Sequence, residues 1–145
     1  MKTIYTAVAT ARGGREGHVR SSDGILDMDL GSPGKAYGSL VRTNPEQLFA
    51  AAYSACFESA LRGAAREQKK EIGATSITAQ VALNRTDDNK YALAVELRGR
   101  IEGVSREEAA ALMQAAHQIC PYSHATRGNV EVKLFAEDAE KTVPA

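Results

Sequence analysis

Two cysteines are the residues of this chain best suited to covalent chemistry. Cys56 lies midway along a helix pattern spanning residues 44–57, and Cys120 ends a second helix pattern just before Pro121. Two cysteines on apolar helix faces are either inert core thiols or a pair brought together for redox chemistry. Because burial disfavours the thiolate, the periodicity alone favours Cys56 as a small core residue.

A reactive Cys56 thiolate would require a nearby cation. Arg15 follows Gly13 and Gly14, where a tight bend would aim its guanidinium inward, although a solvated loop arginine is the plainer interpretation. Spacing in the sequence does not choose among the available cations, which are Arg12, Arg15, Arg20, Arg42 and Arg127.

Glu46 has two alternative roles at the start of the long helix. It stands at the third helical position of a capping box begun by Thr43, where its carboxylate would bond a backbone N–H. Alternatively, Asn44 caps the helix with Pro45 at the first helical position. The functional role for Glu46 is to hold an arginine by a bidentate ion pair, and the sequence leaves these roles open.

A metal site and a structural disulfide are two further interpretations of the cysteines. His117, Cys120 and His124 form H-x2-C-x3-H, and Cys56 would add a fourth zinc ligand. The spacing is loose and no C-x2-C pair is present, so we expect no bound metal. A Cys56–Cys120 disulfide would close a long loop and stabilise the fold by several kcal/mol, but a reducing compartment opposes a permanent one.

Size and charge narrow the class of protein. The 145 residues predict one domain, and equal numbers of basic and acidic residues, 18 each, argue against nucleic acid as a partner. No apolar run approaches the ~20 residues that cross a bilayer, and the N-terminus lacks the apolar segment of a signal peptide. We therefore expect a cytoplasmic protein without a membrane partner, in which paired cysteines are more often catalytic, redox-sensing or metal-binding.

The pattern of elements predicts an α+β protein with the order βββ-α-ββ-α-β and antiparallel sheets. Alternation predicts three N-terminal strands, with Asp23-Gly24 as a two-residue hairpin turn. The second helix opens with a capping box of Ser105 and Glu108. In order, we expect strands at 4–11, 17–22 and 25–30, a loop at 31–42, a helix from 43 or 44 to about 68–71, strands at 77–83 and 91–101, a helix at 105–120, a short polar turn, a strand at 130–134 and a frayed tail at 137–145, all within one domain of residues 1–145.

The long helix has one face of mostly small residues, which would let another backbone approach closely. This face consists of Leu48, Ala52, Ala55, Cys56, Ser59 and Gly63.

Three segments of the chain form a recognisable set: TNPEQLFAAAYSACF at 43–57, AAHQICPYSHATRGN at 115–129 and YTAVATARGGREGHVRSSDG at 5–24. Together they resemble the organic hydroperoxide resistance proteins of the Ohr/OsmC superfamily. The segments agree in order and spacing, and the resemblance extends over residues 3–134.

The resemblance implies a cysteine-based peroxidase that works as an intertwined homodimer around two central helices. By position, Cys56 matches the peroxidatic cysteine and Cys120 the resolving cysteine. Arg15 matches the arginine that stabilises the thiolate and orients the peroxide, and Glu46 matches the glutamate that holds this arginine. The family has no bound cofactor and is reduced by dihydrolipoamide or a lipoylated protein, which is therefore the expected electron donor.

Three departures from the family pattern lie outside these four positions. His18 stands where many relatives have arginine, Ala52 replaces a common glycine, and His124 replaces the usual asparagine. We expect them to affect substrate access or the response to pH rather than the chemistry.

Apolar neighbours of the cysteines suit a pocket for an alkyl or acyl tail, which would favour organic hydroperoxides over hydrogen peroxide. The expected lining residues are Phe49, Phe57, Leu112, Met113 and Ile119. The alternatives are a non-catalytic dimeric thiol or zinc module that senses a ligand, a reductase of small disulfides, and a general OsmC-type relative with weaker tail preference.

Overall fold

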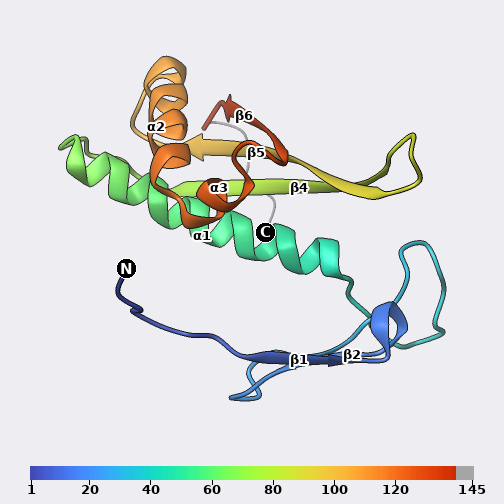
Figure 1. Cartoon of the computed structure of the whole chain (residues 1–145). Coiled ribbons are helices and arrows are strands. Elements are labelled where there is room, and N and C mark those ends of the chain that lie inside the picture. The colour runs from blue at the N-terminus through green and yellow to red at the C-terminus, as the bar shows by residue number, and fades with distance from the viewer. Residues whose placement is uncertain (140–145) are drawn as a thin grey trace. The chain divides into compact units, whose positions relative to one another are not determined.

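The computed structural model describes residues 1–139 and contains two three-stranded sheets and two long helices (Figure 1). The chain divides into two compact units, Met1–Leu48 and the part from Phe49 onward, with the boundary inside the first long helix. The tail beyond residue 139, which includes most of the segment expected to fray, lies outside the described residues. The single domain expected from the length remains a prediction.

The first unit contains an antiparallel meander, as the sequence predicts. Strands β1 (Ala9–Arg12), β2 (His18–Ser21) and β3 (Asp27–Asp29) pair in that order, and a 3-10 turn, η1 (Gly14–Glu16), joins the first two. The strands are shorter than expected, because pairing between β1 and β2 begins only at Ala9 opposite Ser21.

The β2–β3 connection differs from the expected two-residue turn. Residues 22–25 form a longer loop in which the Asp23 carboxylate accepts hydrogen bonds from the Ser21 hydroxyl and the Ile25 N–H. The Ile25 N–H thus bonds to a side chain instead of to a neighbouring strand, which favours a loop at this position. Gly24 has φ +77°, a conformation that favours glycine.

Helix α1 (Pro45–Glu67) begins with Asn44 as its cap, because the Asn44 Oδ1 accepts a hydrogen bond of 2.8 Å from the Gln47 N–H. This result resolves the open choice of cap. The buried residues of the helix are Tyr53, Phe57, Leu61, Ala64 and Ala65. The small-residue face is therefore not the one packed in the core, since Ala55 and Ser59 are exposed and the larger aromatic and aliphatic side chains bury more apolar area.

The sheet of the second unit consists of β4 (Thr75–Arg85), β5 (Tyr91–Ile101) and β6 (Glu131–Glu137). The β4–β5 hairpin is antiparallel, as expected, but β5 and β6 run parallel. The expectation of purely antiparallel sheets was wrong for this pair. Two helices lie between β5 and β6 in the chain, and a connection of that length returns the strand in the same direction.

Helix α2 (Arg106–Ile119) starts with the predicted capping box of Ser105 and Glu108. Where a polar turn was expected, a short helix α3 (Pro121–Thr126) follows. Pro121 ends α2 because it lacks an N–H, but proline is well tolerated at the first position of a new helix. Cys120 is both the end cap of α2 and the start cap of α3.

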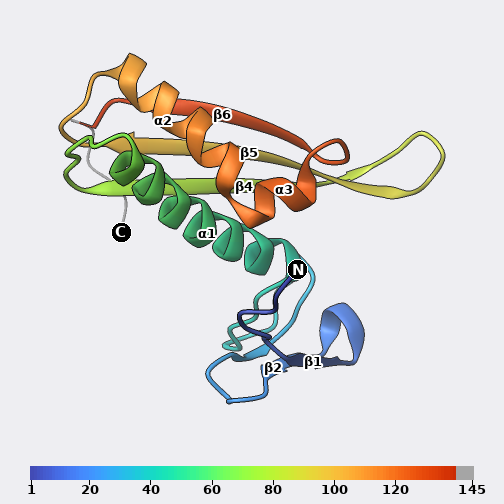
Figure 2. The ribbon, with the colours of Figure 1, turned by 60° about the vertical axis from the view of Figure 1, so that its left-hand side comes forward.

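Helices α1 and α2 run across the sheet of the second unit and enclose its core (Figure 2). From β5, Val95, Leu97 and Ile101 are buried in this core, which Cys120 also joins. Glu137, expected in the frayed tail, instead ends β6 and pairs with Arg100 at 3.0 Å. Cys120 is thus part of the core, and Cys56 packs against it.

Candidate active site

In the first unit, two of the predicted site residues, Arg15 and Glu46, form an ion pair. Arg15 lies in η1, and its two terminal nitrogens donate to the two Glu46 oxygens at 2.8 and 2.6 Å. The Arg15 hydrogen bonds lower the pKa of Glu46 below its ordinary value. Because Asn44 caps α1, the Glu46 carboxylate is available for this bidentate pair.

The turn that carries Arg15 is shaped by glycines and anchored by its neighbour. Gly13 and Gly14 have φ of +76° and +59°, which favours glycine at both positions. The Glu16 carboxylate accepts hydrogen bonds from the Ser32 and Tyr37 hydroxyls, each at 2.6 Å. These bonds lower the pKa of Glu16 and attach η1 to the loop at 31–42, a connection the sequence did not reveal.

In the second unit, the other two predicted site residues are the cysteine pair. The Cys56 and Cys120 sulfurs lie 3.7 Å apart, and both are free thiols. Cys56 on α1 is partly exposed, whereas Cys120 at the α2–α3 junction is fully buried. Since a disulfide has an S–S distance of about 2.05 Å, a small movement of either segment would allow the bond to form.

The surroundings of Cys56 within its own unit oppose the thiolate. Burial raises the pKa of Cys56, and the neighbouring Cys120 thiol raises it further, while a hydrogen bond from the Tyr122 backbone lowers it. Reactivity at neutral pH therefore requires additional stabilisation of the anion, which is the role that the sequence resemblance gives to Arg15.

Hydroxyl groups next to the cysteines form a buried network that the sequence reasoning missed. The Tyr53 hydroxyl shares hydrogen bonds with Ser123 Oγ at 2.9 Å and Thr126 Oγ1 at 3.2 Å. His117 Nδ1 contacts the same Ser123 Oγ at 2.7 Å. The available signal was spacing, because Tyr53 and His117 each precede a cysteine by three residues.

The residues expected to line a tail pocket lie in different environments. Phe57, Leu112 and Met113 are buried in the core, whereas Phe49 is partly exposed and Ile119 is 48% exposed. Ile119 and Phe49 thus retain surface for a substrate, and the pocket as a whole stays a prediction.

The two histidines that depart from the family pattern have different surroundings. His18 bonds Asp29 at 2.7 Å and Asp27 through its other nitrogen, and both carboxylates raise its pKa. His124 is exposed on α3. Within residues 1–139, His, Cys, Asp and Glu side chains form no group of three or more able to hold a metal ion, so the geometry gives no support to the zinc alternative.

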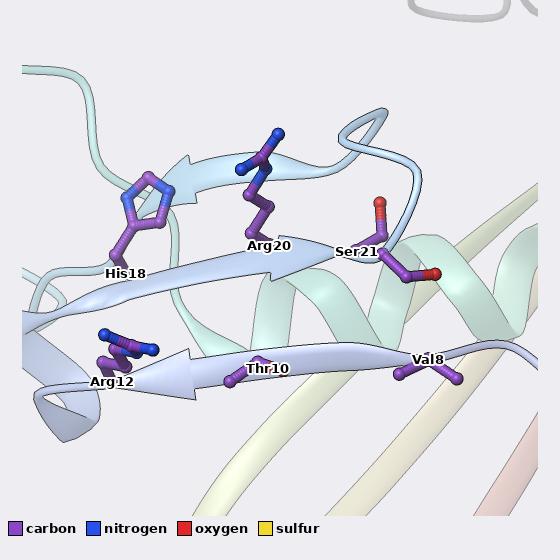
Figure 3. A pocket seen from close by; sticks show the side chains of 7 residues that line it. Val8, Thr10, Arg12, His18, Arg20 and Ser21 are labelled. Carbon is purple, nitrogen blue, oxygen red and sulfur yellow. The ribbon is translucent and has the colours of Figure 1, made fainter.

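A surface pocket of about 410 Å³ on the β1–β2 hairpin contains none of the four predicted catalytic residues (Figure 3). In Figure 3, His18 and Arg20 project from the same side of β2. The lining residues are Val8, Thr10, Arg12, His18, Arg20, Ser21 and Ser22.

Comparison with known proteins identifies the family of this chain. Residues 36–135 match the family model described as OsmC-like protein. The chain is 48% identical over 132 residues to the organic hydroperoxide resistance protein OhrB of Bacillus subtilis, covering 90% of this chain and 96% of the relative. This chain belongs to the organic hydroperoxide resistance proteins of the OsmC-like family.

A second member of the organic hydroperoxide resistance proteins, from Xanthomonas axonopodis pv. citri, is 46% identical over 137 residues, covering 92% of this chain and 94% of the relative. The crystal structure of Bacillus subtilis OhrB matches with a TM-score of 0.88 at 48% identity, over 93% of this chain and 100% of that one. An Elizabethkingia anophelis member matches with a TM-score of 0.86 at 48% identity, over 95% and 99% of the two chains. The expected α+β OsmC-like fold is thereby confirmed.

Proposed function

We propose that this protein is a thiol peroxidase that reduces organic hydroperoxides to alcohols through Cys56 and Cys120. The observation that carries the proposal is the 3.7 Å separation of the two free thiols in a chain of this family. One thiol is accessible to a peroxide and the other is buried beside it, which suits a peroxidatic and a resolving role.

The reaction proceeds in three balanced steps. The Cys56 thiolate attacks the outer oxygen of the hydroperoxide, the O–O bond breaks, and the alkoxide takes a proton to leave as an alcohol. Cys120 then attacks the sulfur of the Cys56 sulfenic acid, so that an S–S bond forms and the oxygen leaves as water. A dithiol reduces the disulfide by exchange, returns both thiols and becomes a disulfide itself.

Arg15 supplies the positive charge that lowers the pKa of the Cys56 thiol and orients the peroxide, while Glu46 holds Arg15 in place. Two observations support these roles. Burial raises the pKa of Cys56 and thus creates a need for a cation. Arg15 is also held by a bidentate pair that fixes its guanidinium plane.

The remaining features of the proposal follow from family membership. An apolar pocket at Phe49, Phe57, Leu112, Met113 and Ile119 accepts the organic tail. Dihydrolipoamide or a lipoylated protein is the electron donor, and the working form is an intertwined homodimer in the cytoplasm. None of the helices within the described residues is long and apolar enough to cross a membrane.

The test is hydroperoxide consumption by purified protein supplied with dihydrolipoamide. We expect rapid turnover of cumene hydroperoxide, slower turnover of hydrogen peroxide, and loss of both activities in Cys56→Ser. Dithiol oxidation without hydroperoxide consumption would instead favour a disulfide reductase. Stoichiometric zinc in protein purified without added metal would favour a binding module.

A further inference from the structure

A buried hydrogen-bond network joins the three helices that carry or flank the two cysteines. It consists of Tyr53 on α1, His117 on α2, and Ser123 and Thr126 on α3, and we call it the hydroxyl network. We propose that Tyr53 and Ser123 are positioning residues, which hold Cys120 where its sulfur can attack oxidised Cys56. This inference rests on the proposed function.

The placement of the network is tied to the cysteines by helical spacing. Tyr53 precedes Cys56 by three residues on α1, about one turn. Ser123 follows Cys120 by three residues on α3, and His117 precedes it by three on α2. The Ser123 hydroxyl therefore connects helices on both sides of Cys120 to the helix that carries Cys56.

Three of the four members of the network are buried, and His117 is partly buried. Tyr53 and Ser123 are both 0% exposed, and Thr126 is 4% exposed. Thr126 Oγ1 also donates to the Ser123 carbonyl at 3.1 Å, which closes the network within α3. Because a buried hydroxyl without a partner is unfavourable, this arrangement specifies one position of α3 against α1, which apolar packing alone does less sharply.

A backbone junction next to Cys120 explains why such a restraint is needed. Pro121 interrupts the helical hydrogen bonds between α2 and α3, so the position of Cys120 depends on how α3 is held. Disulfide formation must shorten the S–S distance from 3.7 Å to about 2.05 Å. A fixed α3 keeps the required movement small.

The consequence is chemical, because a sulfenic acid has two competing fates. It condenses with Cys120 to a disulfide and water, or a second hydroperoxide oxidises it to sulfinic acid, releasing a second alcohol. A loosened junction slows the first reaction without slowing the second. The hydroxyl network thus protects Cys56 from overoxidation.

The experiment uses full-length Tyr53→Phe and Ser123→Ala proteins, each of which removes one hydroxyl and retains most of the packing. The reduced proteins receive increasing amounts of cumene hydroperoxide, and mass spectrometry measures Cys56 sulfinic acid against the Cys56–Cys120 disulfide. We expect a several-fold higher sulfinic fraction in both variants. The double variant should show less than the two single effects combined, because both changes break the Tyr53–Ser123 bond.

Tyr91→Phe and Ser54→Ala serve as matched controls. Tyr91 is 68% exposed on β5, and the Ser54 hydroxyl donates to the Ala51 carbonyl of its own helix. Both should show the wild-type partition. Urea unfolding of every variant separates stability from positioning. Lower stability of Tyr53→Phe and Ser123→Ala with an unchanged sulfinic fraction would overturn the positioning role.

Failure of the proposed function would give a different experimental result from failure of this inference. In that case the wild-type protein itself would consume no hydroperoxide and form neither product, and the positioning role would fall with it. A wild-type protein that forms the disulfide, beside variants that also form it without extra sulfinic acid, would refute only the inference about Tyr53 and Ser123.

Discussion

At the N-terminus of α1, two polar residues on either side of Pro45 have separate roles. Asn44 accepts the Gln47 N–H and caps the helix, while Glu46 binds both terminal nitrogens of Arg15. The sequence allowed Glu46 to serve as the capping partner of Thr43 instead. The choice between these roles fixes whether Arg15 has a rigid carboxylate partner, and it depends on a backbone geometry that residue types alone do not specify.

Replacing Glu46 with glutamine tests the ion pair. The amide keeps the size but loses the charge, so one charge-assisted hydrogen bond of about 1.5–3 kcal/mol is lost. Arg15 is 46% exposed at its side chain, so we expect the lower end of this range. The catalytic efficiency with cumene hydroperoxide should fall roughly tenfold. Glu67→Gln, at the exposed other end of α1, is the control, and equal efficiencies of the two variants would argue against the Arg15–Glu46 role.

The surroundings of His18 predict how the stability of the meander depends on pH. Asp29 and Asp27 hydrogen-bond its imidazole and raise its pKa above 6.5, with Arg12 opposite it on β1. A raised pKa means that the contribution of this cluster to folding is complete below pH 6.5 and is lost as the pH rises through the folded value. NMR titration of the imidazole should give a pKa above 6.5 that falls in Asp29→Asn. An unchanged pKa in that variant would show that Asp29 does not control the charge.

Among the elements, the sequence predicted most helices and strands but not how all of them pair. Alternation of Val130, Val132 and Leu134 indicated the last strand, yet alternation carries no information on direction, and β6 proved parallel to β5. Pro121 correctly marked the end of α2 but also begins α3. The capping box at Ser105 was predictable because both partners are local in the sequence.

The site shows the same limit. The resemblance to the family, rather than the spacing of the residues, identified Cys56, Cys120, Arg15 and Glu46 as site candidates. The structure shows two pairs among them, Cys56 with Cys120 and Arg15 with Glu46. The hydroxyl network escaped prediction because its central bond joins residues 70 positions apart. Serine, threonine and tyrosine are common on surfaces, so their types alone do not indicate burial.

Helix α2 packs against β5 so closely at position 99 that a side chain there would force Met113 to move. A Cβ added to Gly99 would lie 2.4 Å from the Met113 sulfur. Gly99→Ala should therefore destabilise the protein by about 1–3 kcal/mol in urea unfolding, through overpacking of the core. Shortening the opposing side chain in Gly99→Ala/Met113→Val should give less destabilisation than the sum of the single changes. Strict additivity would contradict a direct clash.

On the scale of the whole molecule, the intertwined homodimer is a proposal that the surface of the first unit allows to be tested. The first unit carries large apolar side chains that are exposed in the single chain, including Ile4, Tyr5, Val8, Ile25, Leu26, Leu40 and Val41. A contiguous set of such residues often marks an interface, and the zero formal net charge does not oppose association.

Sedimentation velocity should give a dimer at micromolar concentration. Tyr5→Asp and Ile25→Asp should weaken it, because a buried charge without a partner is unfavourable at an apolar interface. Lys2→Asp, a polar residue in the same terminal segment, is the control. A wild-type protein that sediments as a monomer would contradict the assembly proposed from the family.

The two-cysteine chemistry is tested most directly by a single turnover without any added reductant. Reduced protein is mixed with one equivalent of cumene hydroperoxide per chain, and the remaining thiols and the alcohol formed are counted. The account predicts one alcohol for every two thiols lost, with the Cys56–Cys120 disulfide as the product, and no alcohol in Cys56→Ser. Retention of both thiols after mixing, or equal alcohol formation in Cys56→Ser, would contradict it.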